Sequence, residues 1–344
     1  MKIAVVGGTG NVGTALLRAL KAASLPDLEL VGLARRYPDD AEPYSGVRWI
    51  SVDIASASSE EELVSAFQGA DVVVHLGWMI QPSHDRELLR RGNQGGSLRV
   101  FQAAARAGVG QLVYLSSVGT YAPAVTGTWV DELWPTTGNP ESSYSVDKAA
   151  VERELDAIEG GSMTITRLRP GLILQPDAAS EIGRYFLGRL LPLSLVRPWM
   201  LRLAPWPKEF AVQFVHADDV ADAIVRVIQQ GAGGAFNLAS EPPVDRATLA
   251  ETTGMSMPAA PVGLVRAGTY ATWALHLQPT DVGWIALARG VPLLKTDRAR
   301  NELGWQPRVP ADVVLKDFVE ALGRGRGTAS PAMRPRNPFR KASV

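Results

Sequence analysis

Tyr144 and Lys148 form the residue pair with the clearest chemical potential in this chain of 344 residues. They bound the segment Tyr144-Ser145-Val146-Asp147-Lys148, and a spacing of four places both side chains on one face of a helix. A free tyrosine, with a pKa near ~10, exchanges protons poorly at neutral pH. An adjacent ammonium would lower that pKa, which allows proton exchange with a substrate hydroxyl or carbonyl. The competing interpretation is an ordinary solvent-exposed pair.

Two serine hydroxyls follow the apolar segment 111–115, which has the composition of a buried strand. Ser116 and Ser117 would therefore lie at the carboxyl edge of a sheet, where α/β proteins bind their ligands. A serine at that edge can donate a hydrogen bond to a substrate oxygen that gains negative charge during hydride transfer. The same edge would hold the start of the Tyr144 helix.

A glycine-rich loop follows the first apolar segment, residues 2–6, and opens the helical segment 12–23. Its glycines permit a tight turn, let the backbone approach a pyrophosphate, and let the helix pack closely on the strand. The free N–H groups and the positive end of the helix dipole then receive the phosphates. The loop predicts a dinucleotide site formed by Gly7, Thr9, Gly10, Asn11, Val12 and Gly13.

The end of the second expected strand, residues 28–34, indicates which dinucleotide binds. An acidic residue about 20 positions past the loop would bond the ribose hydroxyl of NAD. Arg35 and Arg36 stand there instead, and paired guanidinium groups suit the 2′-phosphate of NADP. We therefore expect NADP(H) as the preferred cofactor, with NAD(H) possible; the alternative is a pair of solvated surface arginines.

Short apolar segments alternate with helical ones through the first half of the chain, which predicts a Rossmann fold: a doubly wound parallel α/β sheet covered by helices on both faces. The expected strands are 2–6, 28–34, 47–52, 71–76, 111–115, 163–169 and 235–238, and the expected helices 12–23, 60–67, 87–107, 144–159 and 217–229. Residues 1–172 and 214–239 would form the NAD(P)-binding domain, and residues 173–213 and 240–323 a smaller, mostly helical substrate lobe. Residues 324–344, with six basic and no acidic residues, are expected to form a disordered tail.

Overall composition excludes several other classes of protein. The 35 basic and 35 acidic residues cancel, so nothing favours nucleic acid or an anionic membrane as a partner. The chain has no cysteine, its four histidines lack metal-ligand spacing, and no run approaches the ~20 apolar residues of a membrane span. We expect a cytoplasmic protein with no metal and a small-molecule substrate.

The motifs together resemble the extended short-chain dehydrogenases/reductases, the NAD(P)-dependent epimerase/dehydratase family, and in particular uncharacterised actinobacterial members. The resemblance covers about residues 1–320. Its segments are GGTGNVG at 7–13, VDI at 52–54, VVHLGW at 73–78, NQGGS at 93–97, LSSVGTY at 115–121, YSVDK at 144–148, LRPGLI at 168–173, FVHADDVADAI at 214–224 and TDRARNELGWQP at 296–307.

That resemblance implies roles for individual residues. Ser117, rather than Ser116, would be the catalytic hydroxyl, with Tyr144 as acid–base and Lys148 as its partner and as a holder of the nicotinamide ribose. Further cofactor contacts would come from Asp53, Ile54, Leu76, Gly77, Trp78, Asn93, Pro170, Gly171 and Ile173. His216 would not be catalytic, and Asp218 or Asp219 would cap the helix that follows it. A homodimer through the helices at 87–107 and 144–159 is possible by analogy.

The substrate is left open by the sequence. Trp78, Met79 and Gln81 follow the fourth strand and should face the same cleft as Ser117. Aromatic and leucine residues of the lobe form either an apolar pocket or simply the core of the lobe: Leu190, Leu191, Leu195, Trp199, Met200, Leu201, Trp206, Trp273 and Trp284. Arginines there could instead clamp a nucleotide-sugar diphosphate: Arg184, Arg189, Arg197 and Arg202.

Three functions therefore compete. The first is an oxidoreductase that transfers a hydride between NADP(H) and a carbonyl or alcohol of an apolar molecule. The second is a nucleotide-sugar epimerase or dehydratase that recycles its cofactor internally, so the two differ in net cofactor consumption. The third is a dinucleotide-binding redox sensor without chemistry, which the intact Ser117, Tyr144 and Lys148 disfavour.

Overall fold

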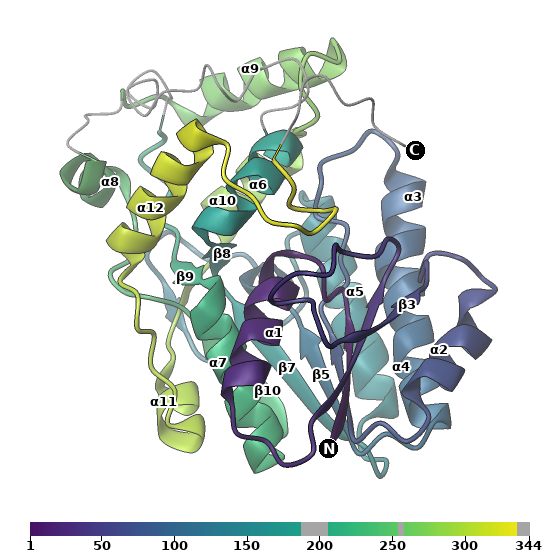
Figure 1. Ribbon diagram of the computed structural model, residues 1–344. Helices are drawn as coiled ribbons and strands as arrows, with labels where there is room; N and C mark the ends of the chain where they lie inside the picture. The colour runs from purple at the N-terminus through teal and green to yellow at the C-terminus, as the bar shows by residue number, and fades with distance from the viewer. Residues whose placement is uncertain (187–205, 254–257, 336–344) are drawn as a thin grey trace.

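A computed structural model describes residues 1–186, 206–253 and 258–335, and Figure 1 shows helices layered against one central sheet. Seven parallel strands follow one another in the order β3-β2-β1-β4-β5-β7-β10, which is a doubly wound Rossmann sheet and confirms the predicted fold class. The strands are β1 (Lys2–Val6), β2 (Glu29–Ala34), β3 (Arg48–Ser51), β4 (Val72–His75), β5 (Gln111–Leu115), β7 (Thr164–Pro170) and β10 (Gly234–Leu238).

Alternate residues of the strands supply two separate cores, one on each face of the sheet. Ile3 and Val5 of β1 belong to one core, and Ala4 and Val6 to the other. Since both faces are buried, the strands read as continuous apolar runs. The first core is covered by α1 (Asn11–Ala22), α7 (Ala217–Gln230) and α11 (Asp297–Leu303), and the second by α2 (Ser59–Phe67), α4 (Gly96–Arg106) and α5 (Ser143–Ile158).

The strands end in register at one edge of the sheet. Val6 pairs with His75, His75 with Tyr114, and Leu115 with Leu168. The segments that follow β1, β4, β5 and β7 therefore start side by side. These segments carry the glycine loop, the 76–79 loop, Ser117 and the Pro170–Ile173 backbone.

One predicted helix is broken where it passes this edge. The range 87–107 divides into α3 (Arg86–Arg90), a π-helical turn η1 (Arg91–Gly95) and α4. Glycines line the inner side of the turn, and a Cβ on Gly92 would lie 1.8 Å from the Met79 methyl carbon. Such turns are rare and occur often at functional sites. The sequence pattern gave no sign of this change in winding.

A third core lies outside the sheet domain and belongs to the predicted lobe. Leu174, Phe214 and Val244 pack there against α12 (Ala311–Arg324). The remaining elements are β8 (Leu172–Leu174), η3 (Pro176–Ala178), α6 (Ala179–Phe186), β9 (Phe214–His216), α8 (Arg246–Thr253), α9 (Val262–Ala274) and α10 (Val282–Gly290). In addition, β6 (Trp129–Val130) pairs with β11 (Leu293–Leu294), and η2 (Val118–Thr120) follows β5. Across the described ranges, no helix is long and apolar enough to cross a membrane, and no group of three histidine or acidic residues could hold a metal.

The cap of α7 differs from the sequence prediction. His216, not Asp218 or Asp219, caps the helix, because its Nδ1 accepts a hydrogen bond from the Asp218 backbone N–H at 3.1 Å. The Asp218 carboxylate instead accepts from Arg18 at 2.9 Å. Asp219 is buried and accepts from the Arg308 and Val309 backbone N–H groups. Both carboxylates therefore join α7 to distant segments.

The basic tail also differs from its prediction. We expected disorder over residues 324–344, yet Arg324 completes α12 and residues 325–335 fold back over the start of α1. Ser330 and Met333 are both 0% exposed. A segment rich in proline, glycine and arginine is disordered when it has no surface to pack on. Here residues 325–335 pack on the glycine loop and the start of α1. Residues 336–344 lie outside the described residues.

Candidate active site

The glycine loop packs so closely that its glycines have no room for side chains. Gly7 has a φ of +85°, and a Cβ on it would lie 2.8 Å from the Gly77 nitrogen. A Cβ on Gly13 would lie 2.4 Å from the Gly7 carbonyl oxygen. At Gly10 the nearest atom would be 3.5 Å away. Gly7 and Gly13 thus fix the loop against the sheet, and Gly10 keeps its outer side open.

The first turn of α1 matches the requirements of a phosphate group. It carries no acidic side chain, and its early N–H groups lie at the positive end of the helix dipole. The Asn11 side chain points elsewhere, donating to the Ile173 carbonyl at 3.2 Å and accepting from Gln175. Asn11 would therefore serve a dinucleotide through its backbone. The loop, the open side at Gly10 and the unopposed helix end fit the diphosphate of such a cofactor.

Arg35 and Arg36 are exposed just past the end of β2. Neither guanidinium makes a hydrogen bond or ion pair that ties it to another of the described residues. Asp53 is also exposed and accepts from the Ala55 N–H at 3.1 Å, while Ile54 packs against Gly96 and Gly77. These residues lie at one end of the cleft. The guanidinium groups of Arg35 and Arg36 and the carboxylate of Asp53 are exposed there and could contact a ligand.

The loop after β4 is held in place from the π-helical turn. Asn93 is buried there, accepts from the Met79 backbone N–H at 2.7 Å and donates to the Met79 carbonyl at 3.1 Å. Leu76, Gly77, Trp78, Met79 and Gln81 are all partly exposed along this loop. Asn93 therefore supports the cleft wall through the Met79 backbone, whereas the sequence analysis expected it to contact the cofactor.

Ser117 and Tyr144 are brought together at the end of β5. Ser117 lies near enough to the Tyr144 phenol to lower its pKa, and Gly119 lies against the Tyr144 ring. Ser116 points the other way and donates to the carboxylate of Glu152. The sequence alone left both serines as candidates, and the geometry puts only Ser117 in the cleft.

The phenol of Tyr144 does not have the lowered pKa that the Tyr–Lys spacing predicted. Burial raises the pKa of Tyr144 to about 12, and the nearby Ser117 hydroxyl offsets part of the rise. Lys148 donates to the Leu115 carbonyl at 2.9 Å and to the Tyr114 hydroxyl at 3.2 Å, and its Nζ lies 3.7 Å from the centre of the Trp78 ring. Burial also lowers the pKa of Lys148 well below its usual value. Tyr144 therefore holds its proton at neutral pH.

The backbone after β7 closes the cleft. Pro170 ends the strand, and Gly171 passes so close to Gln213 that a Cβ would lie 2.5 Å from the Gln213 carbonyl oxygen. Ile173 is partly exposed, and its carbonyl receives the Asn11 side chain. The predicted cofactor residues of this segment therefore lie directly beside the glycine loop.

Aromatic rings form the wall of the cleft beyond Tyr144. Trp78 meets the Tyr144 ring edge-on at 6.0 Å between centroids, Trp284 of α10 lies at 5.3 Å, and Phe186 packs on Trp284 at 4.9 Å. Phe186 also lines a mainly apolar hollow of about 740 Å³. Its lining includes Phe186, Ala260, Leu264, Val265 and Ile285, together with glycine, threonine and glutamine residues.

The other lobe residues singled out from the sequence divide into two groups. Trp206 packs on Phe210, and Trp273 stacks on His84, so neither touches the Tyr144 wall. Arg184 donates to the Ala332 and Arg334 carbonyls of the C-terminal segment. The rest lie outside the described residues: Leu190, Leu191, Leu195, Trp199, Met200, Leu201, Arg189, Arg197 and Arg202.

Two contributors to the site were missed by the sequence analysis. Phe186 belongs to the aromatic wall but lies in a segment without clear periodicity. Arg169 and Glu152 form a buried bidentate pair that also binds Ser116 and the Tyr121 hydroxyl, and so fixes β5, β7 and α5 behind Tyr144. The signal available was the arginine in LRPGLI, because an arginine in a buried strand is rarely found without a partner.

A Rossmann sheet with a glycine loop and a Ser–Tyr–Lys group at one edge defines a nucleotide-binding enzyme of the extended short-chain dehydrogenase/reductase class. Residues 3–239 match the NAD dependent epimerase/dehydratase family, and the chain belongs to that family. Its members and neighbours are enzymes: epimerases, dehydratases and reductases.

Individual relatives are similar at moderate identity. An uncharacterized protein of Mycobacterium tuberculosis is 27% identical over 328 residues, which cover 95% of this chain but 30% of that protein. A ketoreductase of Stigmatella aurantiaca, named for 4-hydroxy-2-methyl-3-oxo-4-farnesyl-3,4-dihydroquinoline-1-oxide, is 25% identical over 342 residues, 95% of this chain and 98% of its own. The dTDP-glucose 4,6-dehydratase DesIV of Streptomyces venezuelae, solved with NAD bound, has a TM-score of 0.68 at 21% identity, over 93% of this chain and 96% of that one.

Proposed function

We propose that the protein is an NADP(H)-dependent oxidoreductase that transfers a hydride between the cofactor and a carbonyl or alcohol of an apolar small molecule. The observation that carries the proposal is the buried phenol of Tyr144, which lies beside Ser117 and is enclosed by Trp78 and Trp284. A protonated phenol in an apolar cleft is suited to act as a general acid. The similarity to a ketoreductase agrees with this assignment.

Reduction of a carbonyl requires a hydride at carbon and a proton at oxygen. When bound, the reduced nicotinamide supplies the hydride. Tyr144 donates its phenolic proton to the carbonyl oxygen, and the Ser117 hydroxyl donates a hydrogen bond to the same oxygen as it gains negative charge. Because its pKa is raised to about 12, Tyr144 enters the reaction protonated, which favours reduction at neutral pH.

Cofactor binding is assigned to the residues around the cleft. Backbone groups of the glycine loop would hold the diphosphate, and Lys148 would hold the nicotinamide ribose. Arg35 and Arg36 would bind the 2′-phosphate, since both guanidinium groups are exposed at the end of β2 and stand where NAD-binding chains carry a carboxylate. That contrast supports NADP(H) as the preferred cofactor, with NAD(H) accepted.

The aromatic wall supports an apolar substrate rather than a nucleotide sugar. Trp78, Trp284 and Phe186 line the approach to Tyr144, and Phe186 also lines the apolar hollow. Arg184, one of the arginines considered for a sugar diphosphate, is engaged with backbone carbonyls of the C-terminal segment. A nucleotide-sugar epimerase with internal cofactor recycling is the alternative.

The test follows consumption of NADPH and NADH with apolar ketones, aldehydes, steroids and nucleotide sugars, using Tyr144→Phe as the control. We expect Tyr144→Phe to lower turnover of an apolar carbonyl by about 10² to 10⁴-fold. Its cofactor dissociation constant should stay within about twofold of wild type, because the ring is retained and one hydroxyl is lost. Full activity of Tyr144→Phe would overturn the assignment of the acid. Bound cofactor without net consumption across the panel would favour the epimerase.

A further inference from the structure

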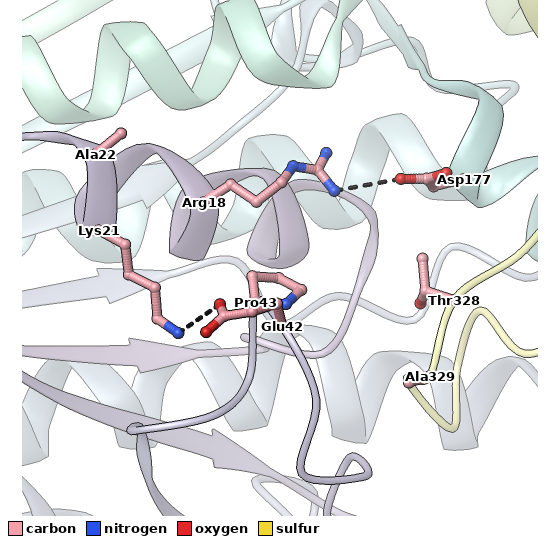
Figure 2. Close-up of a pocket in the computed structure, with 8 residues that line it drawn as sticks. All are labelled: Arg18, Lys21, Ala22, Glu42, Pro43, Asp177, Thr328 and Ala329. Atoms are coloured by element: carbon pink, nitrogen blue, oxygen red, sulfur yellow. Dashed lines mark hydrogen bonds and ion pairs between the residues drawn. The ribbon is translucent and has the colours of Figure 1, made fainter.

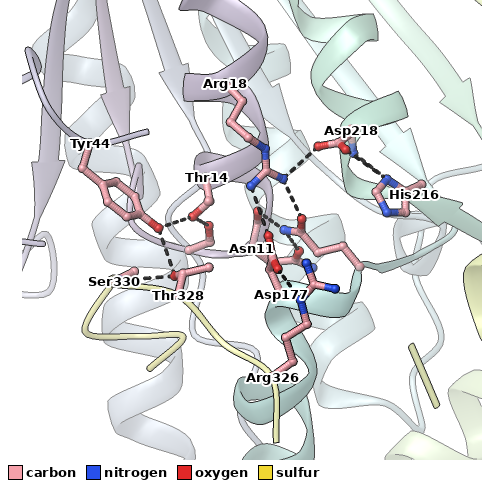
Figure 3. A network of polar contacts seen from close by, with 12 residues as sticks. Asn11, Thr14, Arg18, Tyr44, Asp177, His216, Asp218, Arg326, Thr328 and Ser330 are labelled. Carbon is pink, nitrogen blue, oxygen red and sulfur yellow. Dashed lines mark hydrogen bonds and ion pairs between the residues drawn. The ribbon is translucent and has the colours of Figure 1, made fainter. Parts of the chain in front are cut away.

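The C-terminal segment lies directly on the glycine loop. Residues 325–335, called the strap below, leave α12 and cross the start of α1 (Figures 1 and 3). The Ser330 hydroxyl donates to the Thr9 carbonyl within the loop. Ser330 and Met333 are both fully buried, so the middle of the strap is part of the molecular interior.

The strap is also fastened on both sides of α1. On one side, Thr328 bonds the Tyr44 hydroxyl at 3.1 Å, and Tyr44 bonds Thr14 of α1 at 2.8 Å. On the other side, the Arg326 Nε lies 3.1 Å from the Asp177 carboxylate (Figure 3).

Beyond Met333 the strap joins the segment after β2 to the lobe. Arg334 pairs with Asp39, four residues past Arg35. Arg184 of α6 donates to the Arg334 carbonyl at 2.9 Å. Three walls of the cofactor cleft are therefore linked through one segment: the glycine loop, the segment after β2, and α6. A hollow of about 580 Å³ remains beneath the strap, lined by Arg18, Lys21, Ala22, Glu42, Pro43, Asp177, Thr328 and Ala329 (Figure 2).

The charge of the strap indicates how it relates to a phosphate-bearing ligand. It contains Arg326 and Arg334 and no acidic residue. A segment that occupied a phosphate site by mimicry would present carboxylates to the helix N-terminus, which prefers negative charge. A basic segment beside the same helix end attracts the ligand instead of replacing it.

We propose that the strap is a cofactor clamp, a further binding element that closes over the phosphates of the dinucleotide and slows their release. The proposal rests on the cofactor site of the proposed function. Ser330 and Met333 form the closed centre of the clamp. The ion pairs of Arg326 and Arg334 form its latches, and both are partly exposed, with side-chain exposures of 60% and 39% for the two arginines. Exposed pairs are weak and screened by salt, so the clamp opens without unfolding the sheet domain.

The first test measures NADPH binding and release by nicotinamide fluorescence in the full-length protein. The variant Ser330→Ala removes the bond to Thr9, and Arg334→Gln removes one latch. We expect the double variant to release NADPH about five- to tenfold faster and to bind it more weakly by a similar factor, as for the loss of one buried hydrogen bond and one exposed ion pair. Higher salt should speed release from wild type more than from the double variant.

The matched control is Arg324→Gln, since Arg324 is exposed and pairs with Glu320 on its own helix rather than with a wall of the cofactor cleft. It removes the same charge and should leave release unchanged, with equal thermal unfolding temperatures confirming that all variants fold. Unchanged or slower release in the double variant would overturn the clamp. If wild-type protein binds neither NADPH nor NADH, the proposed cofactor site itself is wrong.

The second test asks whether bound cofactor closes or displaces the strap. Trypsin cleaves after arginine, and the Arg326–Gly327 bond lies inside the strap. A clamp predicts that NADPH slows cleavage at this bond, by about the same five- to tenfold factor that relates closed and open states. Faster cleavage in the presence of NADPH would mean that the cofactor expels the strap, and the proposal would be wrong.

Discussion

The inner and outer walls of the glycine loop are built in different ways. The inner wall consists of backbone in contact with backbone, where Gly7 faces Gly77 and Gly13 faces Gly7. The outer wall consists of side chains from distant segments, with Ser330, Thr328 and Arg326 reaching over α1. The backbone contacts tolerate shifts of only a few tenths of an ångström, whereas an exposed ion pair such as Arg326–Asp177 adapts at little cost. The inner wall sets the shape of the site, and the outer wall adjusts its hold on a ligand.

The largest effect should follow from adding one carbon to the inner wall. In Gly13→Ala the new Cβ would lie 2.4 Å from the Gly7 carbonyl and 2.6 Å from the Gly8 carbonyl carbon, so the loop must move away from α1. We expect NADPH affinity to fall by at least about 100-fold, equivalent to about 3 kcal/mol, in a fluorescence titration.

Gly268→Ala is the control, because a Cβ there would meet no atom within 4 Å, and it should bind as wild type does. If Gly13→Ala binds NADPH nearly as tightly as wild type, the inner wall can shift to accommodate a side chain. The two walls would then not differ in the way described above.

The second effect concerns how the stability of the folded protein depends on pH, through a histidine next to the inner wall. His75 ends β4 behind Gly77, and burial lowers its pKa to about 3. The unfolded chain takes up this proton near pH 6.5, while the folded chain takes it up only near pH 3, so stability falls with pH across that window. The loss reaches about 2 kcal/mol by pH 5. Urea unfolding at pH 7, 6 and 5 should show a smaller loss for His75→Gln.

The exposed His84 provides the comparison for that experiment, since His84→Gln is the same substitution made at the surface instead of at the end of β4. If the free energy of unfolding of His75→Gln falls with pH as steeply as that of wild type, other groups cause the loss of stability in acid.

The smallest effect is expected at the outer mouth of the cleft. Replacing Arg35 and Arg36 together by glutamine should weaken NADPH binding about 10- to 100-fold and leave NADH binding within about twofold, because only the 2′-phosphate is lost as a partner. Parallel titrations with both cofactors measure this difference. An equal loss for NADPH and NADH would assign the arginines to the shared diphosphate, and no loss would make them surface residues.

The difference between the walls also explains what the sequence could predict. Strands such as Lys2–Val6 and Gln111–Leu115 were located at their true bounds because each is apolar on both faces. The glycine loop was recognisable because its spacing is dictated locally by the turn. Tyr144 and Lys148 were placed on one helix for the same reason, and both lie on α5.

Features set by distant contacts could not be read in this way. The π-helical turn depends on Met79 pressing against Gly92, and the choice between Ser116 and Ser117 depends on Glu152 accepting from Ser116. The phenol pKa depends on how completely the lobe encloses Tyr144, which no local spacing encodes. The strap looked like a disordered tail because its composition carries no trace of the surface on which it folds.

The bond between Ser330 and Thr9 has a consequence for the order in which the protein is made. The two residues are 321 positions apart, so the loop leaves the ribosome long before its outer partner does. At the usual rates of synthesis the interval is roughly 15 to 65 s. The sheet domain can fold during that time with the loop uncovered. A newly made molecule therefore passes through a stage in which its glycine loop has folded but is still exposed to solvent.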